Sequence, residues 1–171
     1  LRANYYIILT RRKTHLSTYA INFSHFVLSR FRHFGYYSHA LMNLEDTVKT
    51  DDDFRLMEAT GKKGAGFASF DTVFDCDSVA LLKPKKLSVE EWTAVLDKAK
   101  EQDGKPYDTL YDLADANSIS CVELVRVALM ADPDYEQDFP HFERTIAHAK
   151  NLDPHMFYEC EDFEVVWERR H

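Results

Sequence analysis

Two Ser-x-x-Glu segments mark the starts of two helices, Ser88-Val89-Glu90-Glu91 and Ser120-Cys121-Val122-Glu123. In such a capping box the Ser side chain accepts a hydrogen bond from an N–H of the first turn, and the Glu side chain reaches back to the N–H of the Ser. The first segment predicts a helix that runs to about residue 102. The second predicts a helix over the apolar stretch 122–130, with a cysteine at its very start.

The rest of the chain divides into short apolar segments and two stretches with helical periodicity. Strands are expected at residues 5–10, 36–44, 54–60, 73–82 and 163–167, and helices at 17–34 and 142–150. Gly61, Gly64 and Gly66 predict a flexible connection between strands. Helices and mostly hairpin-linked strands are segregated along the chain, which favours an α+β fold. With 171 residues, the chain is expected to form one domain over residues 1–171.

Charge and composition exclude several classes of protein. The net charge of −8 argues against a nucleic-acid partner, because such proteins gain most of their affinity from cationic contacts with phosphates. No apolar run approaches the roughly 18 residues of a membrane-spanning helix. Three cysteines without a Cys-x-x-Cys pair predict neither a disulfide framework nor a zinc site. The free thiols favour a cytoplasmic location, although secretion stays open for a chain that begins with Leu1.

Cys121 is the first candidate for chemistry. At the first position of a helix its sulfur lies among backbone N–H groups at the positive end of the helix dipole. Thiols in such positions have pKa values lowered to roughly 3.5–7.5, and the same N–H groups can bind an oxyanion. The alternative is a buried cysteine that packs the helix start. Position alone slightly favours that alternative.

His39 and Glu58 are polar residues inside otherwise apolar strands. A thiolate nucleophile needs an imidazole to pair with it and later to protonate the leaving group. If the two strands pair, Glu58 could orient the ring of His39, as the third member of a triad does. The alternatives are a core histidine with satisfied hydrogen bonds and a carboxylate at a solvent-exposed edge.

Several short motifs, in order along nearly the whole chain, make the sequence similar to a known group of enzymes. They are Tyr37-Ser38-His39-Ala40-Leu41, Met57-Glu58-Ala59, Lys105-Pro106-Tyr107-Asp108, Ser120-Cys121-Val122-Glu123-Leu124-Val125, and Asp153-Pro154 followed by Phe163-Glu164-Val165-Val166-Trp167. The chain resembles the permuted papain-like cysteine amidases, the YiiX-like group, which are circular permutants of the NlpC-type cell-wall peptidases. Each motif is short, so the resemblance is carried by their combination.

Two positions depart from that group's pattern. Tyr5-Tyr6 stands where the group has Gly-Asp before its first strand, and Val122 stands where it has Ser after the nucleophile. The first change concerns a turn. The second removes a small polar group near the site and bears on the choice of substrate.

The resemblance implies a papain-like α+β fold, with a curved antiparallel sheet and helices packed on one side. It implies an amidase or peptidase in which Cys121 is the nucleophile, His39 the general base and then acid, and Glu58 the residue that orients His39. Tyr107 is implied to bind substrate, with packing under the nucleophile helix as its alternative. No cofactor and no metal are expected: His141, His148 and His155 recur every seven residues, but Pro154 interrupts the helix.

The substrate implied by the resemblance is a peptide or amide, with cell-wall peptides and lipid-linked acyl groups both open. One alternative function is a thiol acyltransferase or lipid hydrolase on the same fold. Its basic, amphipathic helix at residues 17–34 would then lie against a membrane or an acyl chain. A helix that covers the sheet is the favoured interpretation of that segment, so membrane contact is not expected. The other alternative is a binding module that keeps the fold and has lost activity.

Overall fold

The structure is a computed structural model that describes residues 5–12, 36–44, 55–109, 115–148 and 153–170. The strands are β1 (Ile7–Arg11), β2 (His39–Asn43), β3 (Arg55–Thr60), β4 (Gly64–Ser69), β5 (Ser78–Pro84) and β6 (Phe163–Arg169). The helices are α2 (Asp71–Phe74), α3 (Val89–Lys100), α4 (Cys121–Leu129), α5 (Tyr135–Asp138), α6 (Pro140–His148) and α7 (His155–Glu159). The predicted helix at residues 17–34 lies outside the described residues.

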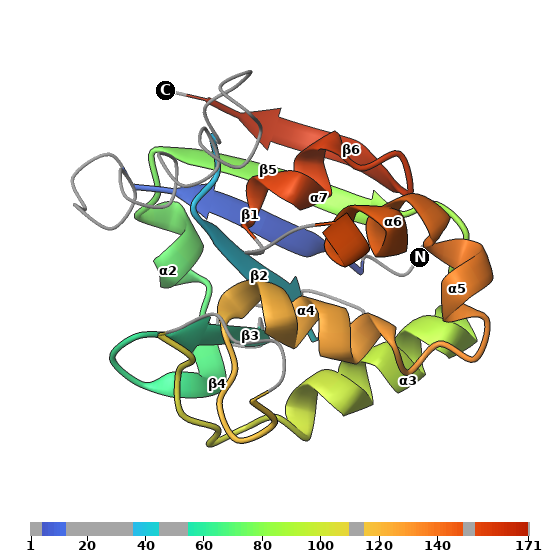
Figure 1. Cartoon of the computed structure of the whole chain (residues 1–171). Coiled ribbons are helices and arrows are strands. Elements are labelled where there is room, and N and C mark those ends of the chain that lie inside the picture. Colours follow the sequence, from blue (N-terminus) through green and yellow to red (C-terminus); the bar gives the residue numbers. More distant parts are fainter. Residues whose placement is uncertain (1–4, 13–35, 45–54, 110–114, 149–152, 171) are drawn as a thin grey trace.

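The strands form a six-stranded sheet in the order β4-β3-β2-β1-β5-β6, and every neighbouring pair is antiparallel. Strand β1 lies between β2 and β5, so Leu9 is opposite Ala40 on one side and opposite Ala80 on the other. Figure 1 shows α3, α4, α6 and α7 over one face of this sheet. The predicted α+β class, with an antiparallel sheet and helices on one side, is therefore confirmed.

Alternation along the central strands divides their side chains between two buried clusters. Ile7 and Leu9 belong to the main core, with apolar side chains from α3, α4, α6 and α7. Ile8 belongs to a smaller cluster with Leu41 and Val79. Helix α4 packs directly on β2 and β3, so the two strands that carry His39 and Glu58 lie under the helix that begins with Cys121.

Two predictions in the middle of the chain are wrong. The glycine-containing segment is not a flexible connection, because residues 61–63 form a tight turn and Gly64–Ser69 is strand β4, paired along its length with β3. The strand expected at residues 73–82 begins only at Ser78. Asp71–Phe74 is instead the short helix α2, which buries Val73 in the smaller cluster.

Among the residues that the structure describes, no helix is long and apolar enough to cross a membrane.

Candidate active site

Helix α4 begins at Cys121, as the capping box predicts. Ser120 Oγ accepts a hydrogen bond from Glu123 N at 3.4 Å, and Ser120 N donates to Glu123 Oε2 at 2.7 Å. The Cys121 side chain is buried, and the residue is 3% exposed. Because the first N–H groups of a helix have no acceptor within the helix, this position can stabilise negative charge on or near the sulfur.

The two capping boxes give a matched pair of variants. We expect Ser120→Ala to lower the free energy of unfolding by about 2 kcal/mol, because this cap is buried, and Ser88→Ala by about 1 kcal/mol, because its equivalent on α3 is exposed. Urea unfolding measures both losses. Only Ser120→Ala should also slow alkylation of Cys121 in the folded protein. Equal alkylation rates in the two variants would show that the cap does not position the sulfur.

His39 and Glu58 come from neighbouring antiparallel strands, and their side chains meet. His39 Nε2 lies 2.9 Å from Glu58 Oε2, with 23% of the His39 side chain and 13% of the Glu58 side chain exposed. Leu41 is the residue opposite Glu58, so His39 is its diagonal neighbour and the long Glu side chain spans the offset.

Both Cys121 and Glu58 act on the imidazole of His39. Burial by itself lowers the pKa of His39, but hydrogen bonds with the side chains of Cys121 and Glu58, together with their negative charge, raise it from 6.5 to about 10. Glu58 occupies Nε2, which leaves Nδ1 as the nitrogen available to the sulfur. The ring therefore links the sulfur at the helix start to a carboxylate on the far side.

The start of β2, where His39 lies, is fixed by contacts that the sequence did not reveal. Ser38 N donates to Thr10 O at 3.0 Å, which ties this point to β1. The hydroxyl of Tyr37 donates to the carboxylate of Glu168 on β6, and burial followed by this contact raises the pKa of Tyr37. The two residues of the Tyr37–Glu168 pair are 131 positions apart, so no local pattern in the sequence could have indicated it.

Tyr107 lies in a segment that leads toward Cys121. Pro106 O accepts from Ile119 N at 2.9 Å, and Ile119 O accepts from Asp108 N at 3.3 Å. These hydrogen bonds hold residues 106–108 beside Ile119, which lies two positions before Cys121. The Tyr107 ring is half-buried against the main core. This position agrees with the alternative interpretation of Tyr107, in which the ring packs in the core. A role in binding substrate stays a prediction.

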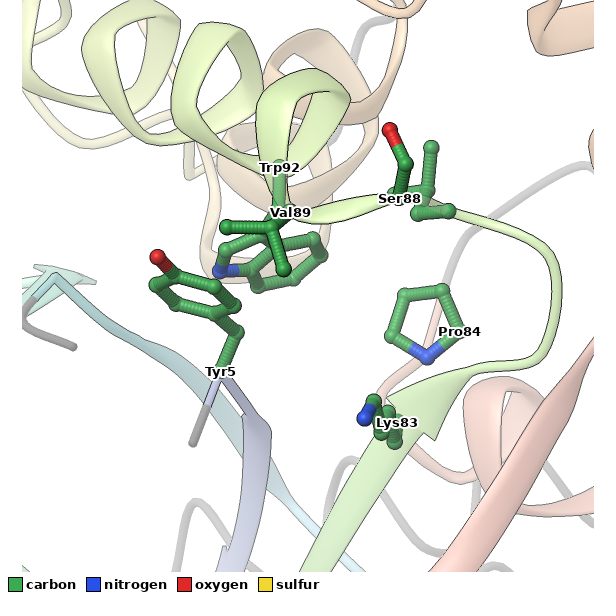
Figure 2. Close-up of a pocket in the computed structure, with 7 residues that line it drawn as sticks. Tyr5, Lys83, Pro84, Ser88, Val89 and Trp92 are labelled. Atoms are coloured by element: carbon green, nitrogen blue, oxygen red, sulfur yellow. The ribbon is translucent and has the colours of Figure 1, made fainter. Parts of the chain in front are cut away.

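Among the described residues, the helices border at least two pockets. The larger has a volume of about 280 Å³ and lies along α4, where Ile119 and Glu123 contribute to its wall on either side of Cys121. The smaller, of about 40 Å³, lies between the start of α3 and the ends of β1 and β5. Figure 2 shows Trp92 and Val89 of α3 above Tyr5, with Pro84 and Lys83 across from them. Cys121, His39 and Glu58 do not line this smaller pocket.

Comparison with known proteins identifies the fold. No family model matches the chain, and no curated protein matches it at a significant level. Among solved structures, the chain is similar to that of the metalloprotein YiiX from Escherichia coli O157:H7, assigned to DUF1105. The match has a TM-score of 0.66 and 17% sequence identity, and it covers 100% of both chains. At this identity the likeness shows a shared fold alone.

Proposed function

We propose that this chain is a cysteine-dependent hydrolase that cleaves an amide bond through Cys121, His39 and Glu58, on a permuted papain-like fold. The observation that carries the proposal is the position of His39. Its Nε2 is hydrogen-bonded to Oε2 of Glu58 at 2.9 Å, and its ring also interacts with the side chain of Cys121 at the start of a capped helix. A nucleophile, a base and a group that orients the base are the three parts of a hydrolytic triad.

The proposed reaction assigns one step to each group. The Cys121 thiolate attacks the substrate carbonyl and forms a C–S bond, while the N–H of Cys121 contributes to binding the oxyanion. His39, protonated at the outset, gives its proton to the leaving amine as the C–N bond breaks. It then removes a proton from the water that hydrolyses the thioester. Glu58 keeps the ring oriented and stabilises its positive charge throughout.

The order of the residues along the chain supports a permuted arrangement. His39 and Glu58 come first, on paired strands, and the nucleophile helix follows at Cys121. In the usual order of the papain-like superfamily the cysteine comes first. The described sheet and the helices over one face are compatible with either order, so the proposal of permutation rests on the positions of these three residues.

YiiX is described as a metalloprotein, so the fit of a metal to this site needs a test of its own. Catalytic zinc sites use three protein ligands. Here Glu58 is hydrogen-bonded to Nε2 of His39, so Nδ1 is the ring nitrogen that can interact with Cys121. The two nitrogens of an imidazole point away from each other, so Glu58 cannot share an ion with Cys121 and Nδ1. This donor set does not fit a metal, and the proposed reaction uses none.

An activated ester tests the proposal without knowledge of the natural substrate. With p-nitrophenyl acetate we expect a burst of p-nitrophenolate equal to the protein concentration, an acetyl group on Cys121 in the acid-quenched protein, and slower steady turnover. Stopped-flow absorbance and peptide mass spectrometry measure the burst and the site. Cys121→Ala should abolish both signals. A Cys160→Ala control should change neither, because burial and its acidic neighbours raise the pKa of Cys160 to about 12.

The outcome also separates the alternatives. Acetylation of Cys121 that reverses in water supports a hydrolase, whereas a transfer to added amines much faster than to water favours an acyltransferase. If Cys121 is acetylated no faster than Cys160, the chain is not a cysteine enzyme and the interpretation as a binding module replaces the proposal.

A further inference from the structure

Three carboxylates meet at the end of the molecule where α3 begins and α4 ends. Glu91 lies in the first turn of α3, Asp132 follows α4, and Asp138 is the last residue of α5. One oxygen from each side chain lies within 4.8 Å of the others. None of the three belongs to the proposed active site.

Asp132 is the residue that makes this cluster more than a group of surface acids. It is 2% exposed, and its Oδ1 accepts from Asp134 N at 3.1 Å. Its Oδ2 is buried and accepts no hydrogen bond from any residue that the structure describes. A buried carboxylate oxygen without a partner costs free energy, since it has lost its water and gained nothing in return.

The positive charge near the cluster does not compensate for this cost. Lys86 Nζ lies 3.8 Å from Asp138 Oδ1, and the Lys86 side chain is 55% exposed. The same amine donates to Gln137 O at 2.6 Å. Among the described residues, Lys86 is thus the cation in contact with the cluster, through Asp138, and Glu91 Oε2 additionally accepts from Ser88 N at 2.7 Å.

We infer that Glu91, Asp132 and Asp138 form a binding site for a hard divalent cation, with Ca²⁺ favoured because it tolerates flexible ligand geometry better than Mg²⁺ does. Carboxylate oxygens are the ligands that Ca²⁺, Mg²⁺ and Mn²⁺ prefer. Oxygens on opposite sides of Ca²⁺ are roughly 5 Å apart, against roughly 4 Å for Mg²⁺. The three ligand atoms lie within 4.8 Å of one another, so a single Ca²⁺ ion can reach all three. The ion would join the start of α3, the end of α4 and α5.

The test uses the full chain stripped with EDTA and then titrated with CaCl₂ or MgCl₂. We expect one Ca²⁺ per chain by equilibrium dialysis, and a rise in Tm of roughly 5–10 °C at a Ca²⁺ concentration a hundred times Kd. Mg²⁺ should give a smaller rise at equal concentration. The absence of any rise in Tm up to about 10 mM Ca²⁺, above the Kd of weak calcium modules, would overturn the inference.

Matched variants place the ion at the cluster. Asp132→Asn should keep its EDTA-state Tm or raise it, because it removes a buried like charge, and it should lose the response to Ca²⁺. Glu136→Gln removes the same charge from an exposed position on α5 and should respond like the wild type. If Asp132→Asn does not fold, Asp138→Asn replaces it and should weaken Ca²⁺ binding at least tenfold. A full response in the folded Asp132 or Asp138 variant would refute the site, whatever the fate of the proposed hydrolase activity.

Discussion

His39→Ala is expected to slow alkylation of Cys121 by iodoacetamide about 10-fold at pH 6. In the proposed ion pair, the His39 pKa of about 10 keeps the ring protonated from pH 6 to about pH 9, where its positive charge favours the reactive form of the sulfur, so the wild-type rate should change little. Without the ring, an ordinary thiol of pKa about 8.5 is roughly 0.3% ionised at pH 6. Its greater intrinsic nucleophilicity recovers only part of that loss.

The raised pKa of His39 decides how the alkylation rate should change with pH in the wild type and in His39→Ala. Because the His39 pKa is raised to about 10, the ring is protonated across neutral pH and loses its proton only as pH approaches 10, so the wild-type rate should be flat across neutral pH. The rate of His39→Ala should instead climb with pH toward the wild-type value. Glu58→Gln should slow the reaction only a few-fold, because Gln still accepts from Nε2 but carries no charge. Alkylation time courses followed by mass spectrometry at several pH values measure all three proteins.

A second histidine–carboxylate pair provides the control. His141 Nδ1 lies 2.8 Å from Asp162 Oδ1, near the start of α6. His141→Ala should therefore leave the Cys121 profile unchanged, and Cys160 should stay unreactive at pH 6 in every variant because its pKa is raised to about 12. If His39→Ala alkylates at the same rate as His141→Ala, Cys121 and His39 do not form an ion pair.

The parts of the structure that the sequence predicted best are those that depend on neighbours along the chain. Both capping boxes form with both of their hydrogen bonds, because a residue and the one three positions on complete the motif between them. His39 and Glu58 stood out for a similar reason, as polar residues in apolar strands. Their strands pair as expected, and the side chains meet.

The errors occur where contacts distant in sequence decide the structure. Val73 and Phe74 favour a strand by composition, yet α2 forms because a helical turn buries Val73 against residues from distant strands. Strand β6 continues to Arg169, two residues beyond the predicted end, because β5 offers Val79 and Ala80 as partners. The diagonal offset between His39 and Glu58 could not be foreseen from the sequence, because the pairing of β2 with β3 is set by the whole sheet.

The glycine segment shows the same limit and leads to a prediction about stability. Gly64 has a φ of +75°, and a Cβ there would lie 2.1 Å from Lys105 O. This close approach lets Ala65 N donate to Lys105 O at 2.8 Å. Gly64→Ala should therefore lower the free energy of unfolding by about 3 kcal/mol or more, from backbone strain plus a clash with a backbone atom that cannot rotate away.

Two other glycines separate these contributions. Gly104 has a φ of +84° but open space around its Cβ position, so Gly104→Ala should cost only the strain, about 1 kcal/mol. At Gly61 the nearest atom is a ring carbon of Tyr107 at 4.0 Å, and the change to Ala should stay within about 0.5 kcal/mol. Urea unfolding of the three variants measures this order. Equal losses for Gly64→Ala and Gly104→Ala would show that the contact with Lys105 is not needed.

Gly64 should also affect the chemistry, through a chain of backbone contacts. Lys105 is held by β4, and Pro106 and Asp108 are hydrogen-bonded to Ile119, two residues before Cys121. A Cβ at position 64 would push Lys105 away, and we expect the displacement to reach the start of α4. We therefore expect the folded fraction of Gly64→Ala to alkylate Cys121 more slowly at pH 6 than the folded fraction of Gly104→Ala does. A normal Cys121 rate in a destabilised Gly64→Ala protein would mean that the capping box alone positions the sulfur.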